Sequence, residues 1–177
     1  MKGAVLNKGE KRYTNLRKLF HAIKNVQRDY NWLITDCECC TRTDAFRERI
    51  FQYGDYGWVS GNELTDMIEA EDFQWIWGVL SGFERSISLK EILTYSMPYA
   101  DMYKGFWVNP VSVQHPLAEI EIVPWDSSCT LIMSRHDRIV DDFTEGFPLC
   151  HDLALYNSCG GQPDETARLN QWLEENR

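Results

Sequence analysis

The sequence lacks the short motifs that identify many enzymes. It contains neither a Gly-x-x-x-x-Gly-Lys-Ser/Thr phosphate loop nor a Gly-x-Gly-x-x-Gly fingerprint, so neither of these nucleotide-binding modes is predicted. The nucleophile elbow Gly-x-Ser-x-Gly and the zinc-protease motif His-Glu-x-x-His are also missing. We therefore predict no catalytic residue and no bound cofactor, and we interpret the chain first as a binding protein.

Long apolar runs are missing as well. The longest clear run lies near Phe73–Leu80, well short of the roughly 20 residues that a membrane-spanning helix needs. The basic start of the chain is not followed by the apolar stretch typical of a secretion signal. We therefore expect a cytoplasmic protein with no membrane partner, in which the cysteines are reduced thiols.

The six cysteines do not have the spacing of a zinc site. The first three follow the pattern Cys-x-Cys-Cys, whereas zinc ligands usually come in Cys-x-x-Cys pairs, so no metal site is predicted. Acidic neighbours at positions 36 and 38 are expected to raise the pKa of the adjacent Cys39 and Cys40 thiols by repulsion between like charges. The sequence leaves a metal or redox role open for Cys37, Cys39, Cys40, Cys150 and Cys159.

Charge is divided unevenly along the chain. Residues 1–30 carry eight Lys or Arg and two acids, a net charge of +6, whereas the other 147 residues carry ten basic and 25 acidic groups, a net charge of −15. The two parts give the overall −9. An acidic body repels nucleic acid and anionic lipid and attracts basic protein surfaces. The expected partner is therefore a basic protein rather than a nucleic acid.

The hydrophobic pattern predicts a single α+β domain over residues 1–177, with a mostly antiparallel or mixed sheet of about five to six strands flanked by short helices. The clearest hairpin joins Ala118–Val123, where apolar and acidic residues alternate, to Cys129–Ser134. Apolar residues fill both faces of Phe73–Leu80, which predicts a central strand. Gly105–Val108 is predicted as a further short strand.

The basic N-terminal part is predicted to form two segments. Residues 1–12 are polar and are expected to be a flexible lead. Residues 14–27 have apolar side chains at helical spacing, so we expect a basic amphipathic helix that packs on the acidic body.

Three helix starts are marked by capping residues. Ser60 with Glu63 and Ser88 with Glu91 have the capping-box spacing. Asp164 is expected to cap a last helix.

Acidic and aromatic residues at predicted surface positions are the candidates for contact with a basic partner. Carboxylates would attract that partner, and exposed aromatic rings would supply contact area. The alternating Glu119 and Glu121 are expected on the solvated face of the hairpin. Trp125 and Tyr99 lie beside prolines in predicted connections, where burial is less expected. The candidate partner-binding residues are Asp36, Glu38, Glu119, Glu121, Trp125, Asp141, Asp142 and Glu145.

An enzymatic alternative uses the histidines. A hydrolase or transferase would need a concave pocket that holds a His beside one or two carboxylates with shifted pKa values. His115 and His136, at predicted strand–turn junctions, are the candidates for such a site.

Part of the C-terminal half resembles small bacterial proteins of uncharacterised function that have a late hairpin followed by a helix. The residues that carry this resemblance are Ala118–Val123, Asp126–Ser128, Cys129–Ser134, Asp137 and Ile139–Val140, about a fifth of the chain. By size, acidity and aromatic content, the chain also resembles the immunity proteins of bacterial toxin systems. This second resemblance implies neutralisation of a basic nuclease toxin, with carboxylates in the positions of phosphates.

Overall fold

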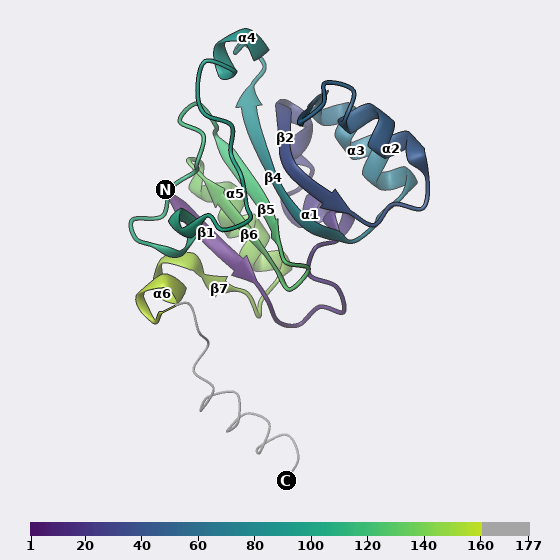
Figure 1. Ribbon diagram of the computed structural model, residues 1–177. Coiled ribbons are helices and arrows are strands. Elements are labelled where there is room, and N and C mark those ends of the chain that lie inside the picture. The colour runs from purple at the N-terminus through teal and green to yellow at the C-terminus, as the bar shows by residue number, and fades with distance from the viewer. Residues whose placement is uncertain (161–177) are drawn as a thin grey trace.

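The computed structural model describes residues 1–160 and shows an α+β domain built on one antiparallel sheet (Figure 1). The sheet has seven strands in the order β3-β2-β4-β5-β6-β1-β7, so the predicted fold class is confirmed and the sheet is slightly larger than expected. The strands are β1 (Lys2–Leu6), β2 (Tyr30–Cys39), β3 (Tyr56–Ser60), β4 (Trp75–Glu84), β5 (Ile120–Trp125), β6 (Cys129–Ser134) and β7 (His151–Asp152).

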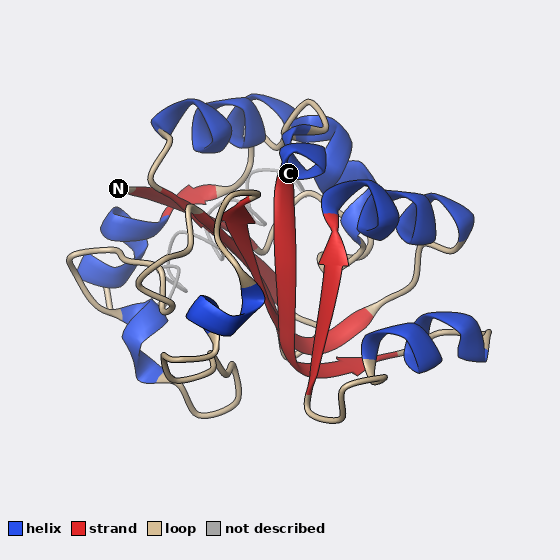
Figure 2. Cartoon of the chain, turned by 90° about the horizontal axis from the view of Figure 1, so that it is seen from above, coloured by secondary structure: helices blue, strands red, loops and turns tan. Residues whose placement is uncertain are grey.

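Helices cover the two faces of the sheet unequally. Seen from above, α1, α3 and α5 lie on one face, and loops with short helices lie on the other (Figure 2). The helices are α1 (Leu16–Ala22), α2 (Asp44–Ile50), α3 (Gly61–Ala70), α4 (Leu89–Ile92), α5 (Asp137–Gly146), α6 (Leu153–Ser158) and the 3-10 helices η1 (Val26–Asp29) and η2 (Lys104–Trp107).

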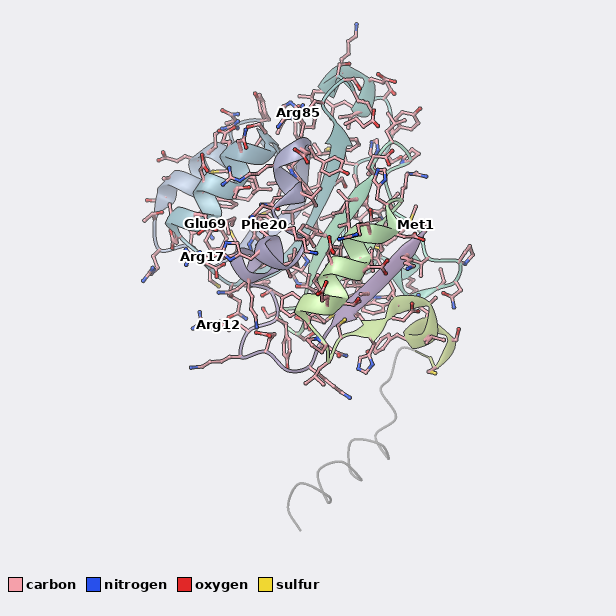
Figure 3. The ribbon with its side chains drawn as sticks, turned by 180° about the vertical axis from the view of Figure 1, so that it is seen from behind. Met1, Arg12, Arg17, Phe20, Glu69 and Arg85 are labelled. Carbon is pink, nitrogen blue, oxygen red and sulfur yellow. The ribbon has the colours of Figure 1, made fainter. Side chains whose placement is uncertain are left out.

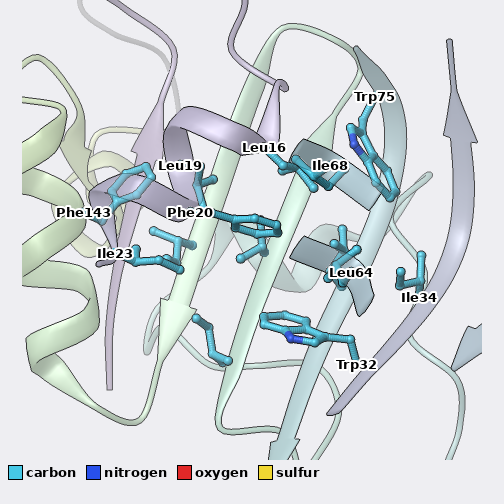
Figure 4. Packing of buried hydrophobic residues seen from close by; sticks show 14 of the residues in the cluster. Leu16, Leu19, Phe20, Ile23, Trp32, Ile34, Leu64, Ile68, Trp75 and Phe143 are labelled. Atoms are coloured by element: carbon cyan, nitrogen blue, oxygen red, sulfur yellow. The ribbon is translucent and has the colours of Figure 1, made fainter. Parts of the chain in front are cut away.

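A row of apolar residues crosses the sheet under the helices. The strand register aligns Ile34, Leu80, Ile122, Ile132 and Ala4 on five neighbouring strands, and all five are fully buried. Side chains from α1, α3 and α5 pack onto this row, as the close view of the core shows (Figure 4). Each fully buried Leu, Ile or Phe stabilises the fold by roughly 1.5–3 kcal/mol through the hydrophobic effect.

The opposite face of the sheet is covered mainly by the long connection between α4 and β5. Phe106, Val111 and Val113 of this connection are buried against apolar residues of the strands, such as Val79 and Val123. This second core explains how the sheet can be apolar on both faces although the longer helices lie on only one of them.

The first residues of the chain are not a flexible lead. β1 pairs with β6 on one side and with β7 on the other, and its Ala4 and Val5 have no exposed surface. The expectation of a flexible lead was wrong for residues 2–6, because a strand buried on both faces lacks the alternation of apolar and polar residues by which a strand is recognised.

The predicted helix over residues 14–27 is shorter than expected. α1 ends at Ala22, and Lys24 and Asn25 adopt left-handed φ angles of 57° and 60° before η1 begins. Leu16, Leu19 and Phe20 of α1 are fully buried, so the helix does pack on the body by its apolar face.

The other sequence expectations have mixed outcomes. The hydroxyls of Ser60 and Ser88 accept hydrogen bonds from the backbone N–H groups of Glu63 and Glu91, as the capping spacing predicted. The predicted strand at residues 105–108 is wrong, because most of it belongs to η2. The last helix, expected after Asp164, lies outside the described residues.

Among the helices of residues 1–160, none has both the length and the apolar character needed to cross a bilayer.

Candidate functional site

The acidic residues of α5 face the basic N-terminal part of the chain. Asp141 accepts a hydrogen bond from Lys2 at 2.8 Å, and Asp142 accepts one from Lys24 at 2.7 Å. Glu145 lies 3.8 Å from the same Lys24 ammonium group. The hydrogen bond from Lys24, with help from Arg138, lowers the pKa of Asp142. These three residues, the α5 carboxylates, are therefore neutralised within the molecule.

Close packing of the helices holds this arrangement in place. A Cβ atom added to Gly146 would lie only 2.6 Å from Cβ of Ala22, so the end of α5 approaches α1 as closely as a glycine allows. On its other side α1 reaches α3, where Arg17 lies 3.3 Å from Glu69 (Figure 3). The basic surface of residues 1–30 is thus partly used in contacts with acids of the same chain.

The two glutamates of the hairpin do not form the expected acidic surface. Glu119 lies 4.0 Å from the guanidinium of Arg135 and 3.2 Å from the ring nitrogen Nε2 of His136. Glu121 is fully buried, because the connection that contains His115 covers this face of β5. Its carboxylate accepts hydrogen bonds from Ser81 Oγ and from the backbone N–H groups of Gln114 and His115. Burial raises the pKa of Glu121 to about 7.

Trp125 is not a free aromatic anchor either. Its ring is half-buried and packs edge-to-face against Trp77 and Trp107, with ring centroids 5.0 and 5.1 Å apart. Such edge-to-face pairs stabilise a core, so Trp125 belongs to the second core rather than to a contact surface.

Three segments meet at the end of β2 to form a cleft of about 640 Å³. The first is the end of β2 itself, the second is the connection from α2 to β3, and the third is the connection from α4 to η2. Trp77 of β4 forms the remaining wall. The cleft residues are Thr35, Asp36, Cys37, Glu38, Phe51, Gly54, Asp55, Trp77, Met97, Pro98, Tyr99 and Asp101.

Asp36 links two of these segments. It occupies a β-bulge of β2 and has a φ of 49°, a left-handed conformation that aspartate tolerates better than most residues. Its Oδ2 atom accepts hydrogen bonds from the backbone N–H groups of Ala100 and Asp101, at 2.7 and 2.9 Å. The bulge therefore shapes the cleft, and Asp36 fixes the third segment against β2.

The cleft has a strongly acidic lining. It includes four carboxylates, the cleft carboxylates Asp36, Glu38, Asp55 and Asp101, and no Lys, Arg or His. All four are exposed residues, and within residues 1–160 none of them takes part in an ion pair with a basic side chain. A concave surface lined by charges of one sign concentrates their potential and attracts ions of the opposite sign.

Exposed apolar side chains gather on the segments that border the cleft. Among residues 1–160, seven of the eleven large apolar residues that are exposed lie in residues 51–53 and 93–102. Phe51, Met97 and Tyr99 line the cleft directly, and Tyr99 exposes 51% of its surface. This combination of exposed aromatic rings and carboxylates is typical of a site that binds cationic groups.

The histidines proposed for catalysis lie elsewhere. Nε2 of the buried His115 contacts the carbonyl of Ile92, and Nδ1 accepts from the N–H of Leu117, so both ring nitrogens are used by the backbone. Exposed His136 contacts Glu119 at the surface. Neither residue lines the acidic cleft. Within residues 1–160, no group of three or more His, Cys, Asp or Glu side chains is arranged to hold a metal ion.

Of the eight residues predicted from the sequence, the structure places only Asp36 and Glu38 in this cleft. Sequence reasoning missed Asp55 and Asp101, which lie in connections without a recognisable pattern. The proline beside Tyr99 was the one local signal for an exposed aromatic ring in this region.

Comparison of the chain with protein-family models, with curated proteins and with solved structures finds no match. The function of the chain therefore has to be inferred from the acidic cleft and its surroundings.

Proposed function

We propose that the chain is a non-catalytic binding protein whose acidic cleft receives a Lys- or Arg-rich segment of a basic protein partner. The observation that supports this most directly is that four carboxylates and three aromatic side chains, Phe51, Trp77 and Tyr99, line one cleft without any basic residue. A guanidinium or ammonium group in the cleft would pair with a carboxylate and stack on a ring.

A protein segment fits the surroundings better than a small cation does. The apolar side chains at residues 51–53 and 93–102 extend the contact surface beyond the cleft itself. Exposed apolar patches beside a polar site are typical of protein interfaces. Among basic proteins, a nuclease toxin domain is the partner that the resemblance to immunity proteins implies. The carboxylates would then occupy the positions of the phosphates that the nuclease binds.

The proposal is tested with an Arg-rich peptide and two variants of equal charge. The cleft variant combines Glu38→Gln, Asp55→Asn and Asp101→Asn, and leaves Asp36 to hold the third segment. The control variant removes three exposed carboxylates outside the cleft, by Asp29→Asn, Glu84→Gln and Glu91→Gln. We expect the cleft variant to bind the peptide at least about tenfold more weakly and the control variant to bind nearly as the wild type does.

The rate of association with the peptide and the binding of a second ligand extend the test. The association rate of the wild type should fall as salt is added, because opposite charges steer the encounter. Equal weakening in both variants would mean that the peptide responds to net charge alone and would contradict the proposal. Binding of the polyamine spermine as tight as that of the peptide would also contradict it, since the cleft would then be a site for small cations.

A further inference from the structure

Two thiols beside the acidic cleft form a pair that the proposed binding function does not use. Cys37 and Cys39 are two residues apart on β2, and both side chains contact the core on the helix-covered face of the sheet. The Cys37 thiol donates a hydrogen bond to the sulfur of Cys39. Cys37 also lines the cleft, whereas Cys39 is buried with 4% of its surface exposed.

The backbone around the pair suits a disulfide. In a regular strand, residues i and i+2 have Cα atoms roughly 6.6 Å apart, at the upper end of the range that a disulfide can bridge. Here the register with β4 shifts twice between Thr35 and Cys39, so the strand is bulged at the pair. A bulge bends the strand and can bring the two Cα atoms closer together.

The surroundings also favour a reactive thiolate at one of the two positions. The hydrogen bond from Cys37 lowers the pKa of Cys39, and the nearby Arg47 guanidinium lowers it further. The pKa of Cys37 is raised by the same hydrogen bond and by burial. The expectation that Asp36 and Glu38 raise the pKa of Cys39 is therefore wrong, because the hydrogen bond from Cys37 and the positive charge of Arg47 lower it.

We propose that Cys37 and Cys39 form a reversible dithiol–disulfide pair, which is oxidised by a small positively charged disulfide such as cystamine that enters through the acidic cleft. This inference does not depend on the proposed binding function.

The reaction proceeds in two exchange steps. Cys37 loses its proton to water, and its thiolate attacks one sulfur of cystamine, while the S–S bond of cystamine breaks and one cysteamine thiolate leaves with its electron pair and takes up a proton. Cys39, whose pKa is lowered, then loses its proton to water, and its thiolate attacks the mixed disulfide at the sulfur of Cys37. The Cys37–Cys39 bond forms as the second cysteamine leaves as a thiolate, which also takes up a proton. Two thiols are oxidised and one molecule of cystamine is reduced to two molecules of cysteamine.

The test uses the full chain with Cys40→Ser and Cys159→Ser, which removes the two exposed thiols. After incubation with cystamine and blocking of free thiols, trypsin releases residues 29–42 as one peptide that retains only Cys37 and Cys39. We expect this peptide to be unblocked and to have lost two hydrogen atoms, about 2 Da, and to regain them on reduction. Recovery of the peptide with both thiols blocked would overturn the proposal.

Two further variants identify the order of the steps. In the same background, Cys39→Ser should trap a single cysteamine on Cys37 as a mixed disulfide, because the second attacking thiol is missing. Cys37→Ser should abolish the loss of the two hydrogens and leave Cys39 largely unmodified because it is buried. In the wild-type chain, a disulfide between Cys39 and Cys40, or bonds between chains in place of the Cys37–Cys39 bond, would also overturn the proposal. This wild-type readout does not depend on how well any variant folds.

Discussion

The α5 carboxylates and the cleft carboxylates are two groups of acidic side chains, three on one helix and four on separate segments, and they have different surroundings. Asp141, Asp142 and Glu145 meet Lys2 and Lys24 of the N-terminal part. The cleft carboxylates meet no basic side chain within residues 1–160. The two sets differ because α1 packs beside α5, whereas the segments around the cleft carry no Lys or Arg in its lining.

This difference shows that acidic charge in a sequence does not by itself mark a binding surface. Most of the acids chosen for their clustering serve the fold, either in ion pairs or, for Glu121, in a buried hydrogen-bond network. An acid is available to a partner only when no basic residue of the same chain reaches it. The experiments below test this distinction, in order of decreasing expected effect.

The largest effect is expected from removing the contact that holds α1 on the sheet. Phe20 is fully buried beneath α1, so Phe20→Ala should lower the free energy of unfolding by roughly 3–5 kcal/mol. Phe51 at the cleft exposes 38% of its surface, so Phe51→Ala should change that free energy by only about 0.5 kcal/mol. Denaturant unfolding measures both values. Similar losses from the two variants would mean that the cleft aromatics belong to the core.

The next effect concerns the buried carboxylate of Glu121. Its pKa of about 7 lies above the ordinary value of 4.5, so the folded state binds more protons than the unfolded state between these values. The free energy of unfolding should therefore fall as the pH rises through this window, by up to about 3 kcal/mol. Burial lowers the pKa of His115, and this contributes an opposite slope just below pH 6.5.

A glutamine variant isolates the contribution of Glu121. The glutamine of Glu121→Gln cannot ionise, but its NH₂ group would face one of the backbone N–H groups that now donate hydrogen bonds to the Glu121 carboxylate. We expect the variant to be less stable than the wild type at pH 4.5, by roughly 1–3 kcal/mol. The difference between the two proteins should shrink as the pH rises toward 7, and a difference that is constant with pH would contradict the raised pKa.

A smaller effect, on the thermal midpoint of unfolding, should distinguish the α5 carboxylates from the cleft carboxylates. Asp142→Asn removes the partner of Lys24, so it should lower the thermal midpoint at low salt, and added salt should reduce the loss. Glu38→Gln removes a charge from a group of like charges, so it should leave the midpoint unchanged or raise it slightly. Differential scanning calorimetry at two salt concentrations measures both. A loss in Glu38→Gln as large as that in Asp142→Asn would show that Glu38 is also paired.

Local patterns in the sequence predicted much of the fold. The β5–β6 hairpin, the caps at Ser60 and Ser88 and the apolar face of α1 each depend on residues close together in the chain. β1 was missed because its burial depends on β6 and β7, more than a hundred residues away. The break after α1 was missed because nothing in the residues around Lys24 and Asn25 marks a left-handed turn.

The candidate site was harder to predict because it consists of segments distant in sequence. Asp36 and Glu38 were identified, but Asp55 and Asp101 join them only after the sheet has formed. The burial of Glu121 could not be read from its alternation with apolar residues, because a loop rather than solvent covers that face of β5. The neutralisation of Asp142 likewise required the docking of α1 beside α5.

The most direct test of the account is where a cationic ligand binds on the wild-type protein. Titration of isotope-labelled chain with the Arg-rich peptide, followed by NMR, should shift the amide signals of residues 35–38, 54–55, 97 and 99–101 together with the Trp77 indole signal. The signals of α5 should stay in place, because Lys2 and Lys24 already occupy its carboxylates. Shifts centred on Asp141, Asp142 and Glu145, with the cleft unaffected, would contradict the account.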